Sequence, residues 1–223
     1  MKRIVDHSIG PMGLLGLSGL LLTGAVSGAE DTNALRDPSF EQGLPAEQGG
    51  WHLFGGRFTA DQARDGQRSL FDAAFEGQSG SYQELPAKPG SRWRLTGYGM
   101  TPAPLRGAPA FGLLQLSFFD AQGKDLGTVE TAGQRFPALT SNRIDASSPS
   151  KDWIRLDTGI GTAPEGTATI QAFTLYVDHA FNLQGAALAA TNFQGVYFDD
   201  LHLCELAAEG DPPRCRPVQR AGD

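Results

Sequence analysis

Six polar and aromatic residues in three alternating stretches of sequence fall on the same side of their predicted strands. They are Thr96, Tyr98, Gln115, Ser117, Thr174 and Tyr176. A tyrosine ring is a flat apolar surface that can pack on the C–H face of a pyranose, and hydroxyl and amide groups can hydrogen-bond to sugar hydroxyls. Apolar surface combined with a few polar groups is typical of ligand sites. We therefore expect an open sugar-binding face, the alternative being that both tyrosines are ordinary cross-strand partners.

Two further residues extend this predicted face. Arg94 has the parity of Thr96 and Tyr98, and its positive charge would favour an acidic or sulfated glycan. Trp51 lies between two glycines and His52, and the sequence leaves open whether it belongs to the rim of the face or to the core.

Asp199 is the carboxylate with the most unusual predicted environment. It shares strand parity with Leu201 and Leu203, which predicts that its side chain points into the interior. A buried carboxylate is costly unless it is paired, hydrogen-bonded or bound to a metal. The simpler alternative is that Asp199 caps a turn.

Residues 30–223 lack the usual sequence signatures of catalysis. They contain no Gly-x-Ser-x-Gly elbow and no His-Glu-x-x-His zinc motif, and His52, His179 and His202 are isolated in sequence. No acidic cluster indicates the pair of carboxylates, roughly 5 Å apart, that a retaining glycosidase needs. We expect no enzyme, and a polysaccharide lyase or glycosidase is the remaining catalytic alternative.

The elements that must position these residues are β-strands. Apolar and polar residues alternate over residues 92–100, 111–119, 169–177 and 196–203. The expected core residues are Trp93, Leu95, Leu114, Leu116, Phe118, Phe173, Leu175, Val177, Tyr197, Leu201 and Leu203. One apolar and one mixed face per strand predicts an all-β fold, an antiparallel two-sheet β-sandwich. The Ser-rich stretch 135–152 is expected to be a long surface loop.

The first 29 residues have the organisation of a bacterial secretory signal peptide. A positively charged start, residues 1–3, precedes an apolar run over 13–26, and small residues follow at 27–29. The apolar run is shorter than the ~20 residues that span a bilayer. We therefore expect export, with the mature protein secreted or periplasmic.

After this leader we expect one β-sandwich module over residues 30–206 and a C-terminal tail over 207–223. Cys204 and Cys215 are the two cysteines, and in an exported protein they are expected to form a disulfide that ties the tail to the last strand. The net charge of −7 disfavours a nucleic-acid partner. No stretch after residue 29 is long and apolar enough to predict a membrane span.

A series of short motifs, taken in order, resembles the landmarks of carbohydrate-binding modules of families 4, 9 and 22. The motifs are Asp37–Gly43, Asp65–Leu70, Gly80–Gln83, Pro89–Leu95, Asp152-Trp153, Thr162–Glu165 and Val196–Leu203. The resemblance covers residues 33–206 and implies a galactose-binding-domain-like β-jelly roll. Asp37 replaces the usual Asn of the first motif, and Trp93 replaces the usual Tyr.

The resemblance also implies a structural Ca²⁺. Its expected ligands are Glu41 and Asp199, with Asp200 as an alternate and carbonyl groups from residues 64–69. Calcium prefers carboxylate and carbonyl oxygens, about six to eight of them. The alternative is that Glu41 is a solvated charge and Asp199 caps a turn.

Together these observations lead to one main hypothesis and one rival. We expect a secreted, non-catalytic, calcium-stabilised β-sandwich that binds a polysaccharide or oligosaccharide, as an accessory to a glycan-degrading enzyme or by itself. The rival is an envelope adhesion or structural module, in which the same polar face meets a protein partner.

Overall fold

The computed structural model describes residues 33–73, 77–105, 110–127, 129–131, 134–136, 139–178 and 194–206. The predicted signal peptide, the predicted C-terminal tail with Cys215, and His179 lie outside these residues. The disulfide between Cys204 and Cys215 therefore stays a prediction. Among the described residues, no helix has the length and apolar character that would let it cross a membrane.

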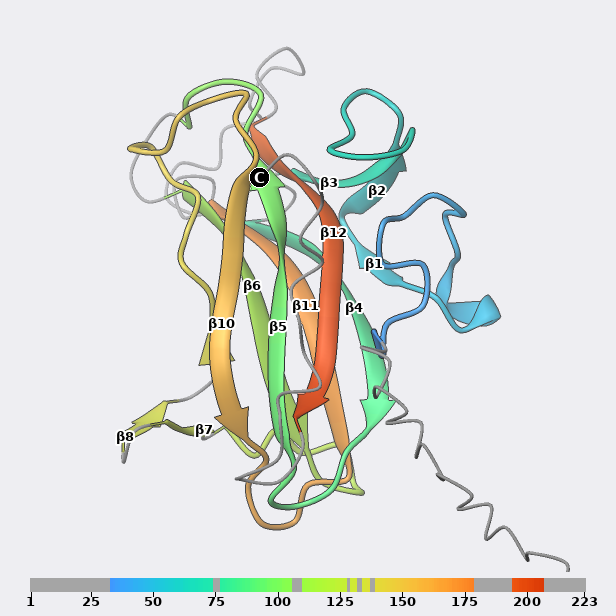
Figure 1. The fold of residues 1–223 in the computed structure, drawn as a ribbon, viewed down its shortest axis with the longest axis vertical. Helices are drawn as coiled ribbons and strands as arrows, with labels where there is room; N and C mark the ends of the chain where they lie inside the picture. The colour runs from blue at the N-terminus through green and yellow to red at the C-terminus, as the bar shows by residue number, and fades with distance from the viewer. Residues whose placement is uncertain are drawn as a thin grey trace, which may run out of the picture.

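The described residues form two antiparallel β-sheets that pack face to face. One sheet has five strands in the order β1-β4-β11-β6-β9, and the other has seven in the order β2-β3-β12-β5-β10-β7-β8. In Figure 1 the layer with β10, β5 and β12 lies in front of the layer with β6, β11 and β4. The predicted all-β, two-sheet sandwich is confirmed.

The strands of the five-stranded sheet are β1 (His52–Phe54), β4 (Gln78–Pro86), β11 (Thr169–Asp178), β6 (Ala110–Phe119) and β9 (Leu139–Thr140). Those of the seven-stranded sheet are β2 (Gly56–Thr59), β3 (Ser69–Ala73), β12 (Gly195–Leu206), β5 (Arg92–Met100), β10 (Ile154–Thr162), β7 (Val129–Thr131) and β8 (Gln134–Phe136). A short 3-10 helix, η1 (Ala46–Gln48), precedes β1.

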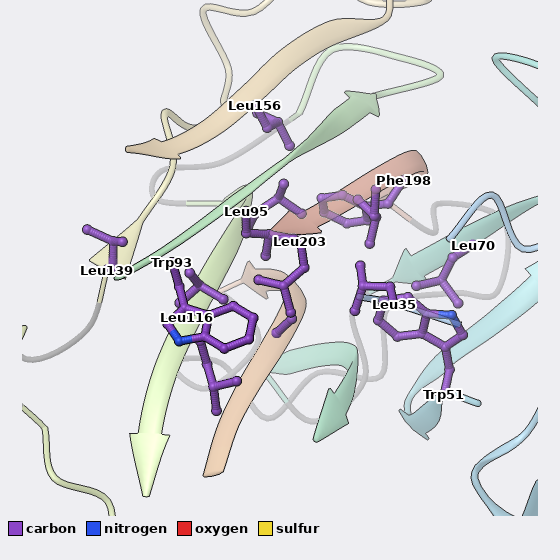
Figure 2. Packing of buried hydrophobic residues seen from close by; sticks show 14 of the residues in the cluster. Leu35, Trp51, Leu70, Trp93, Leu95, Leu116, Leu139, Leu156, Phe198 and Leu203 are labelled. Carbon is purple, nitrogen blue, oxygen red and sulfur yellow. The ribbon is translucent and has the colours of Figure 1, made fainter. Parts of the chain in front are cut away.

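The predicted core residues of β5 and β6 are confirmed. Trp93 and Leu95 of β5 are buried, as are Leu114, Leu116 and Phe118 of β6. Figure 2 shows Trp93, Leu95 and Leu116 packed among side chains of both sheets. Burying such large apolar side chains stabilises the fold by roughly 1.5–3 kcal/mol each.

The predicted orientation of β11 is wrong. Phe173, Leu175 and Val177 are only partly buried, whereas Thr174 and Tyr176 point inward and are buried completely. Tyr176 pairs with Gly112 of β6. Both faces of β11 carry apolar residues, so alternation alone did not identify the inner one.

The predicted parity of β12 is also wrong, because the strand contains an irregularity. Its register against β5 shifts between Asp199 and His202, and Asp200 has a positive φ of 49°. Leu201 and Leu203 are buried as predicted, but Asp199 pairs with Tyr98 and so shares the outer face. Tyr197 likewise packs on that face, in a small cluster with Phe71, Ala73 and Met100.

The stretch 135–152 is not simply a surface loop. Its residues 139–140 form β9, which pairs with β6, and Ile144 is fully buried in the core. The apolar residues Leu139 and Ile144, although spaced among serines, anchor this segment to the five-stranded sheet.

Candidate functional site

The six residues predicted to share one face lie in three different places. Thr96 and Tyr98, with Arg94, occupy the outer face of the seven-stranded sheet, because their strand is central in that sheet. Gln115 and Ser117 of β6 point to the outer face of the five-stranded sheet, on the opposite side of the molecule. Thr174 and Tyr176 lie between the sheets. The predicted single face is therefore wrong.

Two residues predicted to contact ligand belong to the core. Tyr176 is completely buried, and burial together with the neighbouring Asp178 raises the pKa of its hydroxyl. Trp51 is 1% exposed and packs against Phe40, with ring centroids 5.0 Å apart. Its Nε1–H donates a hydrogen bond to the Asp37 carbonyl oxygen at 3.1 Å. Figure 2 places Trp51 beside Leu35 and Leu70, where a ligand cannot reach it.

A row of side chains crosses the outer face of the five-stranded sheet. The strand register places His52 opposite Tyr82, Tyr82 opposite Phe173, Phe173 opposite Gln115, and Gln115 opposite Thr140. Directly opposed residues of antiparallel strands point to the same side of the sheet. We call this row, together with Phe54, the aromatic face.

Ring contacts hold the aromatic face in shape. The His52 and Tyr82 rings are stacked, with centroids 4.6 Å apart and planes inclined by 6°. Tyr82 lies 5.2 Å from Phe173 and 6.4 Å from Phe54, both in tilted arrangements. Such offset and tilted pairs contribute about 0.5–1.5 kcal/mol beyond area burial. Four aromatic rings from three strands therefore form one continuous, partly exposed surface.

Polar groups flank the aromatic face on one side. The next row of the sheet contains Glu84, Gln171 and Ser117. Gln171 Nε2 donates to Glu84 Oε2 at 2.7 Å, and Gln115 Nε2 donates to Ser117 Oγ at 3.0 Å. These hydrogen bonds orient an amide on each side of Phe173. On the other side Phe54 and Leu175, both partly buried, make the surface apolar.

Sequence reasoning missed His52, Tyr82, Phe173, Glu84 and Gln171. In β4 the inward residues Ser79, Ser81 and Gln83 are as polar as the outward ones, so alternation gave no orientation. In β11 the orientation was inverted. The available signal was Tyr82 itself, because its large ring, between Ser81 and Gln83, is more easily accommodated on a partly exposed face than in a buried row of small polar side chains.

On the opposite sheet, Arg94 is engaged within the protein. Its guanidinium pairs with the Asp157 carboxylate through two nitrogens, and Nε donates to Oδ1 at 2.8 Å. Burial alone would raise the pKa of Asp157, but hydrogen bonds from Arg94 and from the Gly159 N–H hold it below its usual value. Tyr98 is covered on one side by Arg64, whose guanidinium carbon lies 3.5 Å from the ring centroid.

The predicted calcium ligands lie around the turn formed by residues 64–68. Asp199 is completely buried, and its Oδ2 accepts a hydrogen bond from the Arg64 N–H at 2.8 Å. Glu41 Oε1 accepts from the N–H groups of Gln67 and Arg68 at 2.9 and 3.0 Å. Asp200 forms an ion pair with Arg64 at 2.7 Å.

These oxygens have the chemistry that calcium prefers, and burial raises the pKa of Asp199 to about 7, with Asp200 and Glu41 adding to the rise. In this arrangement the carboxylates bind the amides of the turn. Within the ranges that the structure describes, no three Asp, Glu, His or Cys residues converge in a metal-binding geometry. A cation here would require the turn to present carbonyl oxygens in place of some N–H groups.

No protein-family model matches this sequence, and no curated protein matches it. Solved structures do share its architecture. The enzymatically active domain of tailspike protein 4 from bacteriophage CBA120 is 12% identical with a TM-score of 0.50, over 78% of this chain and 21% of that chain. The CBM22-2 xylan-binding domain of Paenibacillus barcinonensis Xyn10C is 13% identical with a TM-score of 0.49, over 75% and 97%. TmCBM61, solved in complex with β-1,4-galactotriose, is 12% identical with a TM-score of 0.45, over 78% and 99%.

At these identities the similarity concerns the fold alone. This chain spans only 21% of the tailspike chain, so that protein's activity does not transfer to it. The predicted resemblance to carbohydrate-binding modules is confirmed at the level of the β-sandwich. Family 22 is among the similar structures, family 61 joins it, and families 4 and 9 find no support.

Proposed function

We propose that this protein is a non-catalytic carbohydrate-binding module that holds a polysaccharide chain on the aromatic face. The observation that carries the proposal is the row His52, Tyr82, Phe173 and Gln115, which runs across four strands of one sheet. A row of this kind suits an extended chain better than a small compact ligand. Similar modules, named for xylan binding or solved with a galactan fragment, support the proposal through their shared fold.

The division of labour on the face follows from its chemistry. The rings of Tyr82 and Phe173 offer apolar surface to the C–H groups of pyranose rings, while Gln115, Gln171 and Glu84 offer donors and acceptors to the sugar hydroxyls. The rings already pack on one another and two amides are already oriented by hydrogen bonds. Little side-chain freedom is therefore lost on binding, which favours affinity.

Export, the disulfide and calcium belong to the same proposal. Residues 1–29 would direct the protein out of the cytoplasm, where polysaccharide is met and where Cys204 and Cys215 can pair. A Ca²⁺ held by Glu41 and Asp199 would neutralise the buried carboxylate and fix the 64–68 turn against β12. This role is structural and does not include contact with the glycan.

A protein-binding adhesion module is the second candidate. The observation in its favour is that two partly buried apolar residues, Phe54 and Leu175, lie in line on the outer face of the five-stranded sheet. Clustered apolar surface is a feature of protein interfaces. On this reading the aromatic face would be buried against a partner and would retain no glycan.

Affinity electrophoresis in gels that contain soluble neutral or acidic polysaccharides tests the proposal. We expect one or two glycans to retard the wild type. Tyr82→Ala and Phe173→Ala should each weaken retardation at least about tenfold, because each removes a ring from the row. Ile160→Ala is the matched control, since Ile160 is a comparably exposed apolar residue on the other sheet.

Free migration of a folded wild type on every glycan would reject the module in favour of the adhesion reading. Retardation that survives both aromatic substitutions would place the binding surface elsewhere on the protein.

A further inference from the structure

A separate cavity of about 170 Å³ lies on the outer face of the seven-stranded sheet. It is lined by residues of β5 and β10, by the irregular part of β12 and by the Arg64 turn, among them Arg64, Thr96, Tyr98, Arg155, Asp200 and His202. The aromatic face belongs to the other sheet, so the two surfaces are on opposite sides of the sandwich. In Figure 1 the strands of this face, β10, β5 and β12, form the nearer layer.

The walls of the cavity are fixed by internal contacts. On one side Asn33 Nδ2 donates to the Leu201 carbonyl at 2.7 Å, and its Oδ1 accepts from the Leu203 N–H at 3.0 Å. On the other side the Arg64 guanidinium lies over Tyr98 and pairs with Asp200. These contacts hold Asn33 against β12 and the Arg64 guanidinium against Tyr98 at two sides of the cavity.

Arg155 is the cation best placed to bind an added anion. Its nearest acidic neighbour, Asp157, already binds Arg94 through both carboxylate oxygens. Arg155 approaches Asp157 only at 3.6 Å, and its side chain is 45% exposed at the cavity. A guanidinium presents five N–H donors in a planar fork that matches a carboxylate or sulfate. At 3.6 Å the contact with Asp157 is long for a charge-assisted hydrogen bond.

The remaining lining suits a sugar. Thr96 supplies a hydroxyl, Asp200 a carboxylate and His202 an imidazole, and Tyr98 gives the cavity an aromatic wall. At about 170 Å³ the cavity is small, whereas the aromatic face runs across four strands of the other sheet. It suits one residue, at the end of a chain or in a side branch. The protein carries a net charge of −7, so its overall electrostatic field repels anions. An anion can therefore bind only where a positively charged side chain attracts it at short range.

We propose that this cavity binds a single anionic sugar residue, a uronate or a sulfated sugar, whose acidic group is held by Arg155 and whose hydroxyls meet Thr96 and Asp200. The inference does not require a ligand on the aromatic face. If both surfaces bind, one molecule contacts a glycan at two points on opposite sides, or bridges two chains. Bivalent contact raises the apparent affinity for a dense polysaccharide without any new interaction.

Calorimetric or NMR titration with monosaccharides tests this site directly. The probes are D-glucuronate, D-galacturonate and galactose 6-sulfate, with glucose and galactose as neutral counterparts and acetate and sulfate as simple anions. We expect at least one acidic sugar to bind at least about tenfold more tightly than its neutral counterpart. The acidic sugar that binds most tightly then shows whether the site prefers a carboxylate or a sulfate group. Arg155→Gln should weaken that binding at least about tenfold, and added salt should weaken it further.

Arg57→Gln is the matched control, because it removes the same charge from an exposed arginine on the same sheet. Tyr82→Ala should leave the titration unchanged, which separates this site from the aromatic face. Acidic sugars that bind no more tightly than neutral ones, or an Arg155→Gln protein that binds like the wild type, would overturn the proposal. Acetate or sulfate binding as tightly as the acidic sugars would overturn its sugar component.

Discussion

At the scale of single residues, Asp72 of β3 is the most unusual group of the interior. It points between the sheets and is completely buried, and neither carboxylate oxygen has a hydrogen-bond partner of good geometry. Burial raises its pKa from 3.8 to about 7, although the nearby Thr174 hydroxyl partly opposes the rise. Ser79 Oγ and Tyr176 Oη are buried without partners as well. This polar interior next to β4 is a local weakness of the sandwich.

The raised pKa of Asp72 predicts how stability depends on pH. The folded protein holds this proton up to about pH 7, whereas the unfolded chain releases it near pH 3.8. Stability is therefore greatest below the unfolded pKa and falls as the pH rises through the folded one, by on the order of 4 kcal/mol. Asp72→Asn should remove this loss, and urea unfolding at pH 5 and pH 8 measures the part of it between pH 5 and pH 7, about 3 kcal/mol.

The control for this prediction is Asp61→Asn, a substitution of an exposed aspartate that should leave the pH dependence intact. An Asp72→Asn protein whose stability changes between pH 5 and pH 8 as much as that of the wild type would show that Asp72 keeps an ordinary pKa when folded.

At the scale of elements, the contact between β6 and β12 determines how closely the two sheets pack. Gly112 of β6 lies against Val196 of β12, and a Cβ at Gly112 would stand 2.7 Å from Val196 Cγ2. The same glycine pairs with Tyr176, whose ring turns inward. One small residue thus allows close packing of the two sheets.

Gly112→Ala should destabilise the protein by about 1–3 kcal/mol, because the added methyl overpacks a dense core. Val196→Ala alone should cost about 1 kcal/mol or somewhat more, since it leaves a cavity. The double variant should lose less unfolding free energy than the two single variants combined, because the smaller side chain at position 196 leaves space for the new methyl group. Chemical denaturation of the four proteins gives the coupling, and strictly additive losses would show that these residues do not contact each other.

The 64–68 turn and β12 make a second element-scale prediction. If Glu41 and Asp199 hold Ca²⁺, then EDTA should lower the melting temperature and added Ca²⁺ should restore it, because a ligand that binds only the folded state stabilises it. Asp199→Ala should melt at a lower temperature and lose the response to EDTA. Asp125→Ala, in an exposed turn far along the chain from these residues, is the control that should keep the response. A wild type whose melting temperature ignores both EDTA and Ca²⁺ would exclude the metal.

At the scale of the whole molecule, the sandwich presents two chemically different outer faces. The five-stranded sheet has the aromatic face, the proposed site of a polysaccharide chain, and the seven-stranded sheet has the cavity with Arg155, the proposed site of one acidic sugar. Because the core lies between them, substitutions on one face should leave the other unchanged. Glycan retention by Tyr82 and Phe173 and monosaccharide binding by Arg155 are therefore separable in experiments.

The sequence alone determined the class of fold and part of its core. Strict alternation placed Trp93, Leu95, Leu114, Leu116 and Phe118 correctly, because one face of β5 and of β6 is clearly more apolar than the other. It also predicted that Asp199 is buried. The prediction placed its side chain in the interior, whereas Asp199 is buried on the outer face of the sheet, opposite Tyr98. A period of two shows that a strand has two faces, and where they differ strongly it also shows which is inside.

Tertiary structure decided the rest of the fold and the whole candidate site. The inner face of β11 is set by packing although both of its faces carry apolar residues, and the irregularity at Asp200 reverses the parity of β12. Neither can be read from local alternation. The row from His52 to Gln115 exists only because three non-local strand pairings bring four separate segments into register. Pairing partners and register depend on the packing of the complete sandwich, so only the folded structure could bring these residues together.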